Sequence, residues 1–249
     1  MSLINREEEE RSLESVRENG LNLEHIENQS YDICFEAVRE NGYALEFVKK
    51  QMRQICLMAV RRCGLALEYV EDPDDEICLE AVKRDGHALR FVKKQTREIC
   101  LAAVRQCGWA LQYVEEQTDE ICLAAVEQNG CALMCVKNQT EEIIRKAVEQ
   151  DGVALRHVAY QTEGDCSLSS IVYKAICLVA VKQADHALEY VKEQTEEICF
   201  EAVRQNGHAL MHVKEQTEEM CWEAMGESMC TWHIRDTELR KRIEKRLGL

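Results

Sequence analysis

Glycine recurs every 22 residues through most of the chain, and this period constrains the fold more than any other feature. The series comprises Gly20, Gly42, Gly64, Gly86, Gly108, Gly130 and Gly152; Asp185 then takes the same slot after an 11-residue insertion, and Gly207 follows. We count positions from this slot, so that position +1 follows it and position −1 precedes it. Self-similarity at a fixed period is typical of solenoids, in which each unit covers the apolar face of its neighbour.

Each unit predicts two short helices. The shared pattern is Ile-Cys-Leu-x-Ala-Val-x-x-x-Gly-x-Ala-Leu-x-x-Val-x-x-Gln-Thr-x-Glu. Thr118 suits a helix N-cap, and Gly130 suits a left-handed turn at the end of the first helix. Apolar residues cover more than half of the first helix but only a narrow stripe of the second, so the second should be more exposed. With only one proline in 249 residues, the sequence predicts an all-α fold, a superhelical α-solenoid.

We expect a single α-solenoid domain over residues 1–249. Its units lie at about 8–29, 30–51, 52–73, 74–95, 96–117, 118–139, 140–161, 162–194 with the insertion at 164–174, 195–216, and a degenerate unit at 217–235. In that last unit Met229 takes the glycine slot and Trp232 the leucine slot, so a second helix is doubtful there. A capping helix should follow at 236–249, with Leu239, Ile243 and Leu247 on one face.

The repeat pattern resembles a family of short two-helix repeats catalogued only as a domain of unknown function, which occurs in bacterial, protist and large-virus proteins. The resemblance covers about residues 11–225, and Ala103-Val104, Gly108 and Ala110-Leu111 stand in its motif positions. It implies an α-solenoid and brings no catalytic residues. Asp185 and the insertion depart from the pattern.

Cysteine is abundant, with fourteen in the chain, but its spacing favours packing over chemistry. Stacked helices lie ~8–10 Å apart, whereas a disulfide needs Cα atoms within about 7 Å, and no Cys-x-x-Cys pair suggests zinc. Two weak metal hypotheses remain: Cys131 and Cys135 with His157, and the cluster His186, His208 and His212. We expect no metal and no cofactor. The cysteines at position −8 are Cys34, Cys56, Cys78, Cys100, Cys122, Cys177, Cys199 and Cys221.

Motifs for catalysis are absent from the sequence. It contains no Gly-x-Ser-x-Gly elbow and no glycine-rich phosphate loop, and nucleophile, base and oxyanion donors do not assemble into one site. We therefore expect no enzyme. A basic row at position −3 (Arg17, Arg39, Arg61, Lys83, Arg105, Lys182 and Arg204) is mostly preceded three residues earlier by glutamate, which predicts ion pairs. A net charge of −15 also disfavours nonspecific binding to nucleic acid.

The start of the chain, MSLINREEEERSLESV, has no apolar signal-peptide core, and no apolar run approaches the ~18 residues that span a bilayer. We expect a cytoplasmic protein that does not enter a membrane. Delivery into a host cell by a route without a signal peptide stays open.

A glutamine recurs just before each N-cap, and we expect its amide to satisfy backbone groups at the turns between units.

Aromatic and amphipathic side chains recur at positions +1 and +5, which an α-helical wheel places on the flank of the buried stripe. They serve either as packing between units or as a binding strip, since Tyr, Trp and Phe anchor interfaces. The pairs are Leu21/His25, Tyr43/Phe47, Leu65/Tyr69, His87/Phe91, Trp109/Tyr113, Cys131/Cys135, Val153/His157, His186/Tyr190 and His208/His212.

We expect a non-catalytic scaffold that binds another protein through the exposed ridge of second helices. The partner-binding residues would be Tyr43, Phe47, Tyr69, Phe91, Trp109, Tyr113 and Tyr190. One alternative is an acidic decoy of phage or pathogen type that blocks a nucleic-acid-handling host or immune enzyme. A second is single-stranded nucleic-acid binding by base stacking, which lacks the basic groove it needs. The sequence leaves open the identity of the partner, the oligomeric state and any role of the insertion.

The predicted stack has a simple consequence in solution. Small-angle scattering should give a radius of gyration well above the ~18 Å of a globule with this many residues. A value near that of a globule would contradict an extended solenoid.

Overall fold

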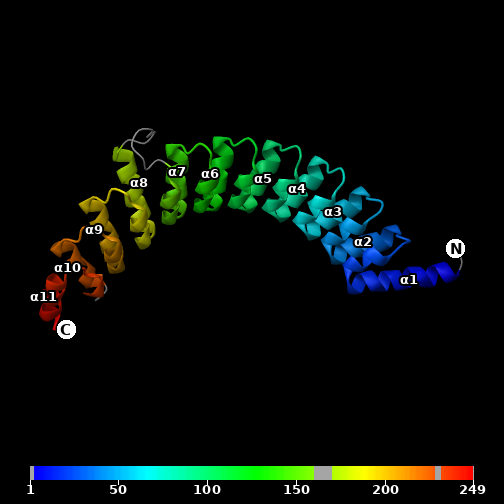
Figure 1. The fold of residues 1–249 in the computed structure, drawn as a ribbon. Helices are drawn as coiled ribbons and strands as arrows, with labels where there is room; N and C mark the ends of the chain where they lie inside the picture. The colour runs from blue at the N-terminus through cyan, green and yellow to red at the C-terminus, as the bar shows by residue number, and fades with distance from the viewer. Residues whose placement is uncertain (1–2, 160–169, 228–230, 249) are drawn as a thin grey trace. The chain divides into compact units, whose positions relative to one another are not determined.

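The computed structural model describes residues 3–159, 170–227 and 231–248. Over these residues it contains α-helices and 3₁₀-helices and no strand, and within each of two units successive repeats pack on one another, so the α-solenoid prediction is confirmed (Figure 1). Contacts divide the chain into two compact parts, called unit 1 (Met1–Gln128) and unit 2 (Asn129–Leu249) from here on, and each 22-residue unit of the sequence is called a repeat. The expectation of a single domain stays a prediction.

Each unit is a series of α-helices alternating with short 3₁₀-helices, labelled η. Unit 1 contains α1 (Leu3–Glu18), η1 (Gly20–His25), α2 (Tyr31–Glu40), η2 (Gly42–Phe47), α3 (Arg53–Arg62), η3 (Gly64–Tyr69), α4 (Asp75–Arg84), η4 (Gly86–Phe91), α5 (Arg97–Gln106), η5 (Gly108–Tyr113) and α6 (Asp119–Gln128). Unit 2 contains η6 (Gly130–Cys135), α7 (Glu141–Gln150), η7 (Gly152–His157), α8 (Ser170–Gln183), η8 (Asp185–Tyr190), α9 (Glu196–Gln205), η9 (Gly207–His212), α10 (Glu218–Glu227), η10 (Thr231–His233) and α11 (Thr237–Leu247).

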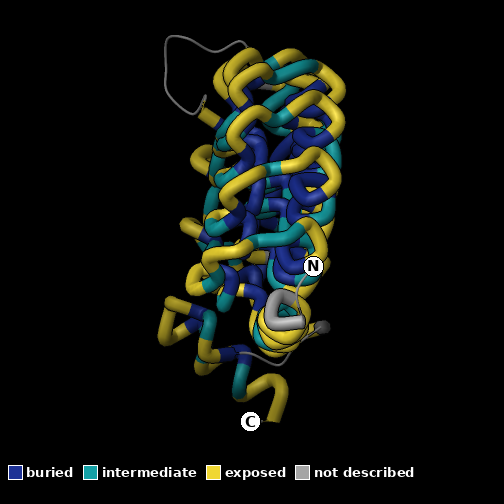
Figure 2. Tube along the Cα trace, turned by 90° about the vertical axis from the view of Figure 1, so that its right-hand side faces the viewer, coloured by how far each residue is buried: buried dark blue, intermediate teal, exposed yellow. Residues whose placement is uncertain are grey.

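The core follows the repeat pattern closely. In the second repeat, Ile33 and Val38 from α2 and Leu45 from η2 are almost fully buried, and Figure 2 shows buried residues running through the interior. The predicted N-cap is also present, because the Ile121 backbone N–H donates to the Thr118 hydroxyl at 3.4 Å. Where Ser, Thr or Asp precedes the first helix, as at Ser30, Asp74 and Thr96, its side chain caps the helix, whereas Met52 makes no such bond.

The second helix differs from the one the sequence predicted, because it is a 3₁₀-helix of six residues and not an α-helix. Its N-cap is the residue at position −1, as where the Tyr43 N–H donates to the Asn41 side chain at 3.0 Å. A 3₁₀-helix has three residues per turn, so positions +1 and +4 share a face. The prediction that positions +1 and +5 are neighbours on one face is therefore wrong.

The repeated glycine also has a different cause from the one predicted. Among the described residues only Gly248 has a positive φ, so Gly130 is not in a left-handed turn. Instead, a Cβ on Gly64 would lie 2.5 Å from the carbonyl oxygen of Ala81 in the next repeat, and one on Gly130 would lie 2.4 Å from that of Ala147. Glycine is needed because the backbones of adjacent repeats approach too closely for any side chain.

The glutamine before each N-cap joins one repeat to the next, as predicted. Gln51 Nε2 donates to the Tyr69 carbonyl at 2.7 Å, and the Glu71 N–H donates to Gln51 Oε1 at 3.1 Å. The Cys56 thiol donates to the same oxygen, with Sγ 3.6 Å away. The glutamine bonds recur at Gln29, Gln95, Gln139, Gln194 and Gln216. Pro73 takes this slot once, and Gln161 lies outside the described residues.

The C-terminal end of unit 2 corrects one register assignment. Thr231 and Ile234 are buried, whereas Trp232 is 62% exposed. The Gln216 amide bonds to the His233 carbonyl, which corresponds to position +5 in the other repeats. The last repeat is therefore one residue shorter than the period, and Trp232 does not fill the leucine slot. Met229, which was predicted to take the glycine slot, lies outside the described residues.

The terminal helix and the insertion follow their predictions in part. α11 begins after the N-cap Asp236 and buries Leu239 and Ile243, but Leu247 stays 37% exposed. α8 has 14 residues where its neighbours have 10, so the last part of the insertion lengthens this helix. Residues 164–169 lie outside the described part of the chain.

Replacing Gly64 with alanine should destabilise the protein, because the new Cβ would meet the backbone of the next repeat. Overpacking of this kind costs about 1–3 kcal/mol, which urea denaturation of the full chain would measure. Gly226 in α10 is the matched control, since a Cβ added there would have no atom within 4 Å. Gly226→Ala should instead stabilise by about 0.5–1 kcal/mol. Equal effects of the two changes would contradict the close-approach explanation.

Candidate functional site

The predicted aromatic residues all lie on 3₁₀-helices, and most are half-buried. Tyr43 is exposed over 37% of its surface. The intermediate positions are Phe47, Tyr69, Phe91, Trp109, Tyr113 and Tyr190. The row is therefore accessible, but its side chains also face neighbouring repeats.

Contacts between repeats account for part of this burial. The Tyr43 ring meets the Tyr69 ring edge-on with centroids 6.3 Å apart, and His87 meets Tyr113 in the same way at 6.2 Å. Both contacts join position +1 of one repeat to position +5 of the next. The Cys63 thiol also lies against Tyr43 and is the main cause that raises the pKa of its hydroxyl to about 12. These contacts show that the row packs between repeats.

The remaining predicted residues are not brought together in this way. Phe91 lies beneath the Arg90 guanidinium, whose carbon is 4.5 Å from the ring centroid. Among the described residues, no ring contact joins Phe47, Trp109 or Tyr190 to another aromatic of the predicted set. The seven residues therefore form a discontinuous row, in which Tyr43 and Tyr69 contact each other and Tyr113 contacts His87, which is outside the predicted set.

Position +4 belongs to the same surface and was missed by the sequence analysis. It is exposed in all nine repeats where it is described: Glu24, Glu46, Glu68, Arg90, Gln112, Met134, Arg156, Glu189 and Met211. Met134 and Met211 are 59% and 49% exposed. The α-helical wheel used for the sequence did not group this position with the binding strip, whereas the three-residue period of a 3₁₀-helix places it on the same face as position +1. We call positions +1, +4 and +5 together the second-helix ridge.

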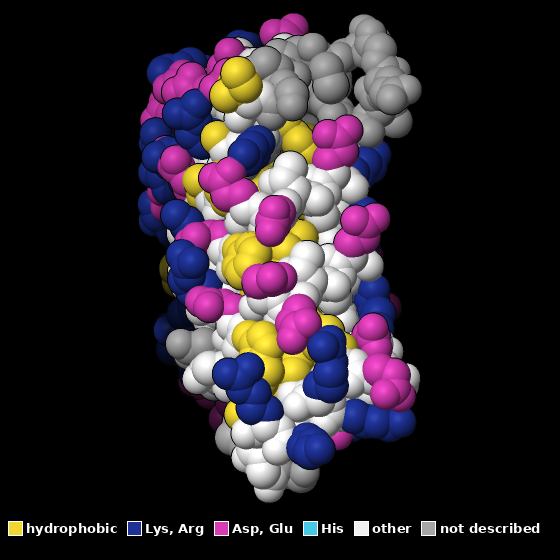
Figure 3. Space-filling model, turned by 90° about the vertical axis from the view of Figure 1, so that its left-hand side faces the viewer, with side chains coloured by type: hydrophobic (Ala, Val, Ile, Leu, Met, Phe, Trp, Pro, Cys, Tyr) yellow, Lys and Arg dark blue, Asp and Glu magenta, His cyan; other side chains and the backbone are white. Residues whose placement is uncertain are grey.

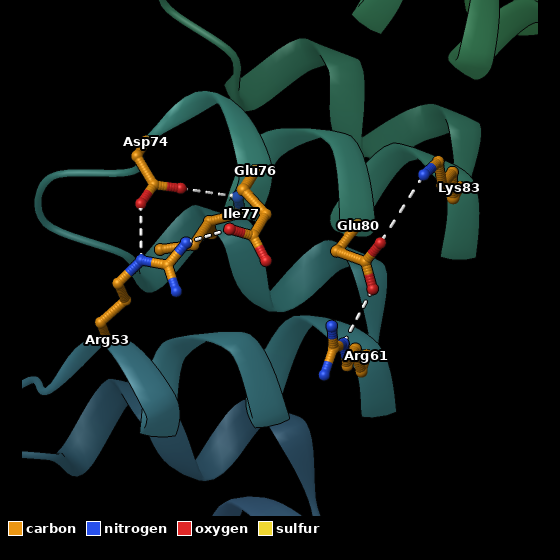
Figure 4. A network of polar contacts seen from close by, with 7 residues as sticks. All are labelled: Arg53, Arg61, Asp74, Glu76, Ile77, Glu80 and Lys83. Atoms are coloured by element: carbon orange, nitrogen blue, oxygen red, sulfur yellow. Dashed lines mark hydrogen bonds and ion pairs between the residues drawn. The ribbon is translucent and has the colours of Figure 1, made fainter.

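Six of the seven residues in the basic row on the first helices are paired with glutamates, as predicted, whereas Arg105 has no ion pair among the described residues. The Glu80 carboxylate lies 2.8 Å from Arg61 of the preceding repeat and 3.7 Å from Lys83 of its own, and the Arg61 guanidinium is the main cause that lowers its pKa (Figure 4). Glu36 holds Arg17 and Arg39 in the same way, and Glu201 holds Lys182 and Arg204. This row consequently does not form a continuous basic track for a phosphate backbone.

The face of the molecule drawn in Figure 3 is mixed in character. Figure 3 views the molecule from the side on which α11 lies in Figure 1, and hydrophobic side chains appear there as separate patches between acidic and basic ones. Within the described part of the chain, no helix is long and apolar enough to cross a membrane.

The twelve described cysteines are all free. Burial raises the thiol pKa of seven of the cysteines at position −8, to about 11 for Cys78, Cys177 and Cys221. A protonated thiol is a poor nucleophile and a poor metal ligand. The cysteines at position −8 therefore serve as packing residues, and in several repeats the thiol also donates to a glutamine oxygen. Cys166 and Cys230 lie outside the described residues.

The two metal hypotheses place their residues in other contacts. Cys131 Sγ lies 3.5 Å from an Asp151 oxygen, and His157 Nε2 accepts from Arg156 at 2.9 Å. In the second cluster, His208 Nδ1 lies 3.1 Å from His233 Nε2, a partner that the sequence analysis did not name. Across the described residues, no group of three His, Cys, Asp or Glu side chains is placed to hold a metal ion.

The family model of a domain of unknown function, DUF4116, matches the chain four times, at residues 31–73, 53–95, 74–118 and 96–139. Together the matches span residues 31–139, so this segment is similar to the repeats of that family, which confirms the resemblance inferred from the motif. Comparison with curated proteins and with solved structures gives no match. The chain thus contains helical repeats, and the family that they match is one of unknown function.

The raised thiol pKa values predict lower stability at alkaline pH. In the unfolded chain a thiol loses its proton near pH 8.5, whereas native Cys78 keeps it until about pH 11. The native state then holds more protons, so the free energy of unfolding is unaffected below about pH 8.5 and falls between there and pH 11. Urea midpoints across this range would measure the fall. Cys78→Val, which cannot titrate, should show a smaller fall, and an unchanged pH dependence would contradict the assignment.

Proposed function

We propose that the chain is a non-catalytic scaffold that binds another protein through the second-helix ridge. One observation supports this most directly: the ridge holds a regular backbone while its side chains vary. Position +4 is exposed in every described repeat, yet it changes from Glu68 to Arg90, Gln112 and Met134 across four consecutive repeats. If the ridge served only in packing, residue type at position +4 would not need to change from repeat to repeat. Selection of one partner does need such a change, because different residues along the ridge then match different parts of the partner.

The ridge of unit 1 has the side chains of a protein interface. Trp109 and Tyr113 lie half-buried on η5, with Gln112 exposed beside them. Aromatic residues of this kind anchor interfaces because they bury a large area at low entropic cost, and flanking charges then set orientation and specificity. Trp109, Tyr113, Tyr43 and Tyr69 would be the anchors, and position +4 would set the choice of partner.

The ridge is a poorer match to nucleic acid. A surface for single strands combines stacking aromatics with a positively charged groove. Here the exposed residues at position +4 of unit 1 include three glutamates and a single arginine. A protein surface that mixes apolar and charged groups is the partner that this ridge fits best.

Substitutions on η5 should remove the partner while the fold survives. We expect Trp109→Ala with Tyr113→Ala to abolish capture of the protein that the full chain retains from an extract of its source cells. Because Tyr113 also packs on His87, Gln112→Lys is a second variant that changes the exposed surface without removing a ring, and it should weaken capture at least several-fold. Circular dichroism would verify that both variants are folded.

Tyr31→Ala is the matched control, since Tyr31 is 41% exposed but lies on α2 outside the ridge. It should leave capture unchanged. Loss of capture with Tyr31→Ala, or retention with both η5 variants, would contradict the proposal. Binding that disappears with salt or with added polyanion, and is unaffected by the η5 variants, would instead indicate an acidic decoy.

A further inference from the structure

Four consecutive turns of unit 1 carry charges that alternate in sign from one turn to the next. In each turn, positions +7 and +8 and the first residue of the following α-helix share one sign and are exposed. The bands are Lys49, Lys50 and Arg53 (band 1), Glu71, Asp72 and Asp75 (band 2), Lys93, Lys94 and Arg97 (band 3), and Glu115, Glu116 and Asp119 (band 4).

The bands lie side by side along one edge of unit 1, where the connecting turns follow one another (Figure 1). The Glu71 N–H bonds to Gln51 beside band 1, and the Glu115 N–H bonds to Gln95 beside band 3. Bands 2 and 3 begin α4 and α5, which pack on each other. The edge therefore presents a row of positive, negative, positive and negative groups at the spacing of the repeats.

This alternation is not a property of the repeat as such, because unit 2 lacks it. Three of the corresponding turns there mix both signs, namely Lys192-Glu193, Lys214-Glu215 and Arg235-Asp236, and Lys137-Asn138 carries a single charge. Since these turns have the same backbone role, they serve as an internal comparison. The sorted bands of unit 1 need an explanation that does not apply to unit 2.

Charges that alternate over ~8–10 Å cancel beyond the screening length, which is about 8 Å at physiological salt. The edge therefore exerts little attraction on an evenly charged partner such as nucleic acid. It is complementary only to a surface in contact with it that alternates at the same spacing. A second copy of the same edge has that spacing.

We propose that this edge forms a two-fold symmetric dimer with a second copy of the chain, with the two edges antiparallel. An axis between bands 2 and 3 places band 2 of each copy against band 3 of the other, and band 1 against band 4. Every band then faces one of opposite sign, which is the self-complementarity that a two-fold interface requires. A parallel pairing in register would set like charges opposite each other, so the pattern also fixes the orientation.

Part of this charge is used within the chain. Arg53 pairs with Asp74 and Glu76, and Arg97 pairs with Glu120 (Figure 4 shows the first of these). The turn residues Lys93 and Lys94, which precede α5, are exposed. Because exposed ion pairs are individually weak and screened by salt, the dimer should depend strongly on ionic strength.

Sedimentation equilibrium of the full chain is the direct test. A dimer is expected at 0.1 M salt, and a monomer at 1 M salt, where the screening length falls to about 3 Å. A monomer at both salt concentrations, or a dimer that salt does not weaken, would overturn the proposal.

Charge reversal tests the geometry. Lys93→Glu with Lys94→Glu makes band 3 acidic, and Glu71→Lys with Asp72→Lys makes band 2 basic, so each variant alone should be monomeric at 0.1 M salt. An equimolar mixture should dimerise again, because every facing pair in the mixed dimer is opposite in sign. A mixture that stays monomeric would overturn the antiparallel pairing.

Two further variants separate the dimer from a role within the chain. The quadruple variant that combines all four reversals restores opposite signs across the two-fold axis, although like charges now adjoin within each chain. It should dimerise, and a monomeric, destabilised quadruple variant would overturn the proposal in favour of an intrachain role. Lys241→Glu with Lys245→Glu on α11 gives the same change of net charge as the band 3 variant and should leave the dimer intact. None of these residues lies on the second-helix ridge, so failure here would not affect the proposed scaffold function.

Discussion

The close approach of each glycine to the backbone of the next repeat is the constraint on which the rest of the structure depends. A Cβ at Gly20, Gly42 or Gly64 would lie 2.3–2.6 Å from an alanine carbonyl oxygen at position −5 of the next repeat. Backbone in contact with backbone leaves no side chain to absorb a change in spacing. The separation of adjacent repeats is therefore set by the main chain and is the same wherever glycine recurs, whatever the surface residues are.

Such close contact hides backbone polar groups from water, and buried polar groups without partners are costly. The glutamine at position +9 satisfies these groups at the turns, since its amide both donates to and accepts from the next repeat. The cysteine at position −8 adds a compact thiol that fits the core and donates to the same amide oxygen. Because these few positions supply partners for the buried polar groups, the exposed position +4 is not needed for packing and is able to vary.

Much of this organisation could be predicted from the sequence, because it depends on local, repeated signals. The unit length, the N-cap at Thr118, the core slots and the inter-repeat role of glutamine all follow from residue type and spacing. The 3₁₀ geometry could not be predicted, because six residues such as GYALEF satisfy an α-helical or a 3₁₀ pattern equally well. The cause of the glycine was misassigned for a related reason: a close tertiary contact and a left-handed turn both select glycine. The shift at Thr231 was likewise invisible, since only the hydrogen bond from Gln216 to His233 reveals it.

The 3₁₀ geometry also changes which residues are available to a partner. On an α-helix, Tyr43 and Phe47 would form one exposed pair; on η2, Tyr43 turns toward Tyr69 of the next repeat, and position +4 becomes the outermost side chain. The residues that vary most freely are thus charged or flexible, while Tyr43, Tyr69 and Tyr113 are held by ring contacts between repeats. A surface built this way has rigid apolar anchors and adjustable polar groups beside them, an arrangement that favours specific over promiscuous binding. Selectivity would then reside in position +4, which no motif marks, and not in the aromatics that first draw attention in the sequence.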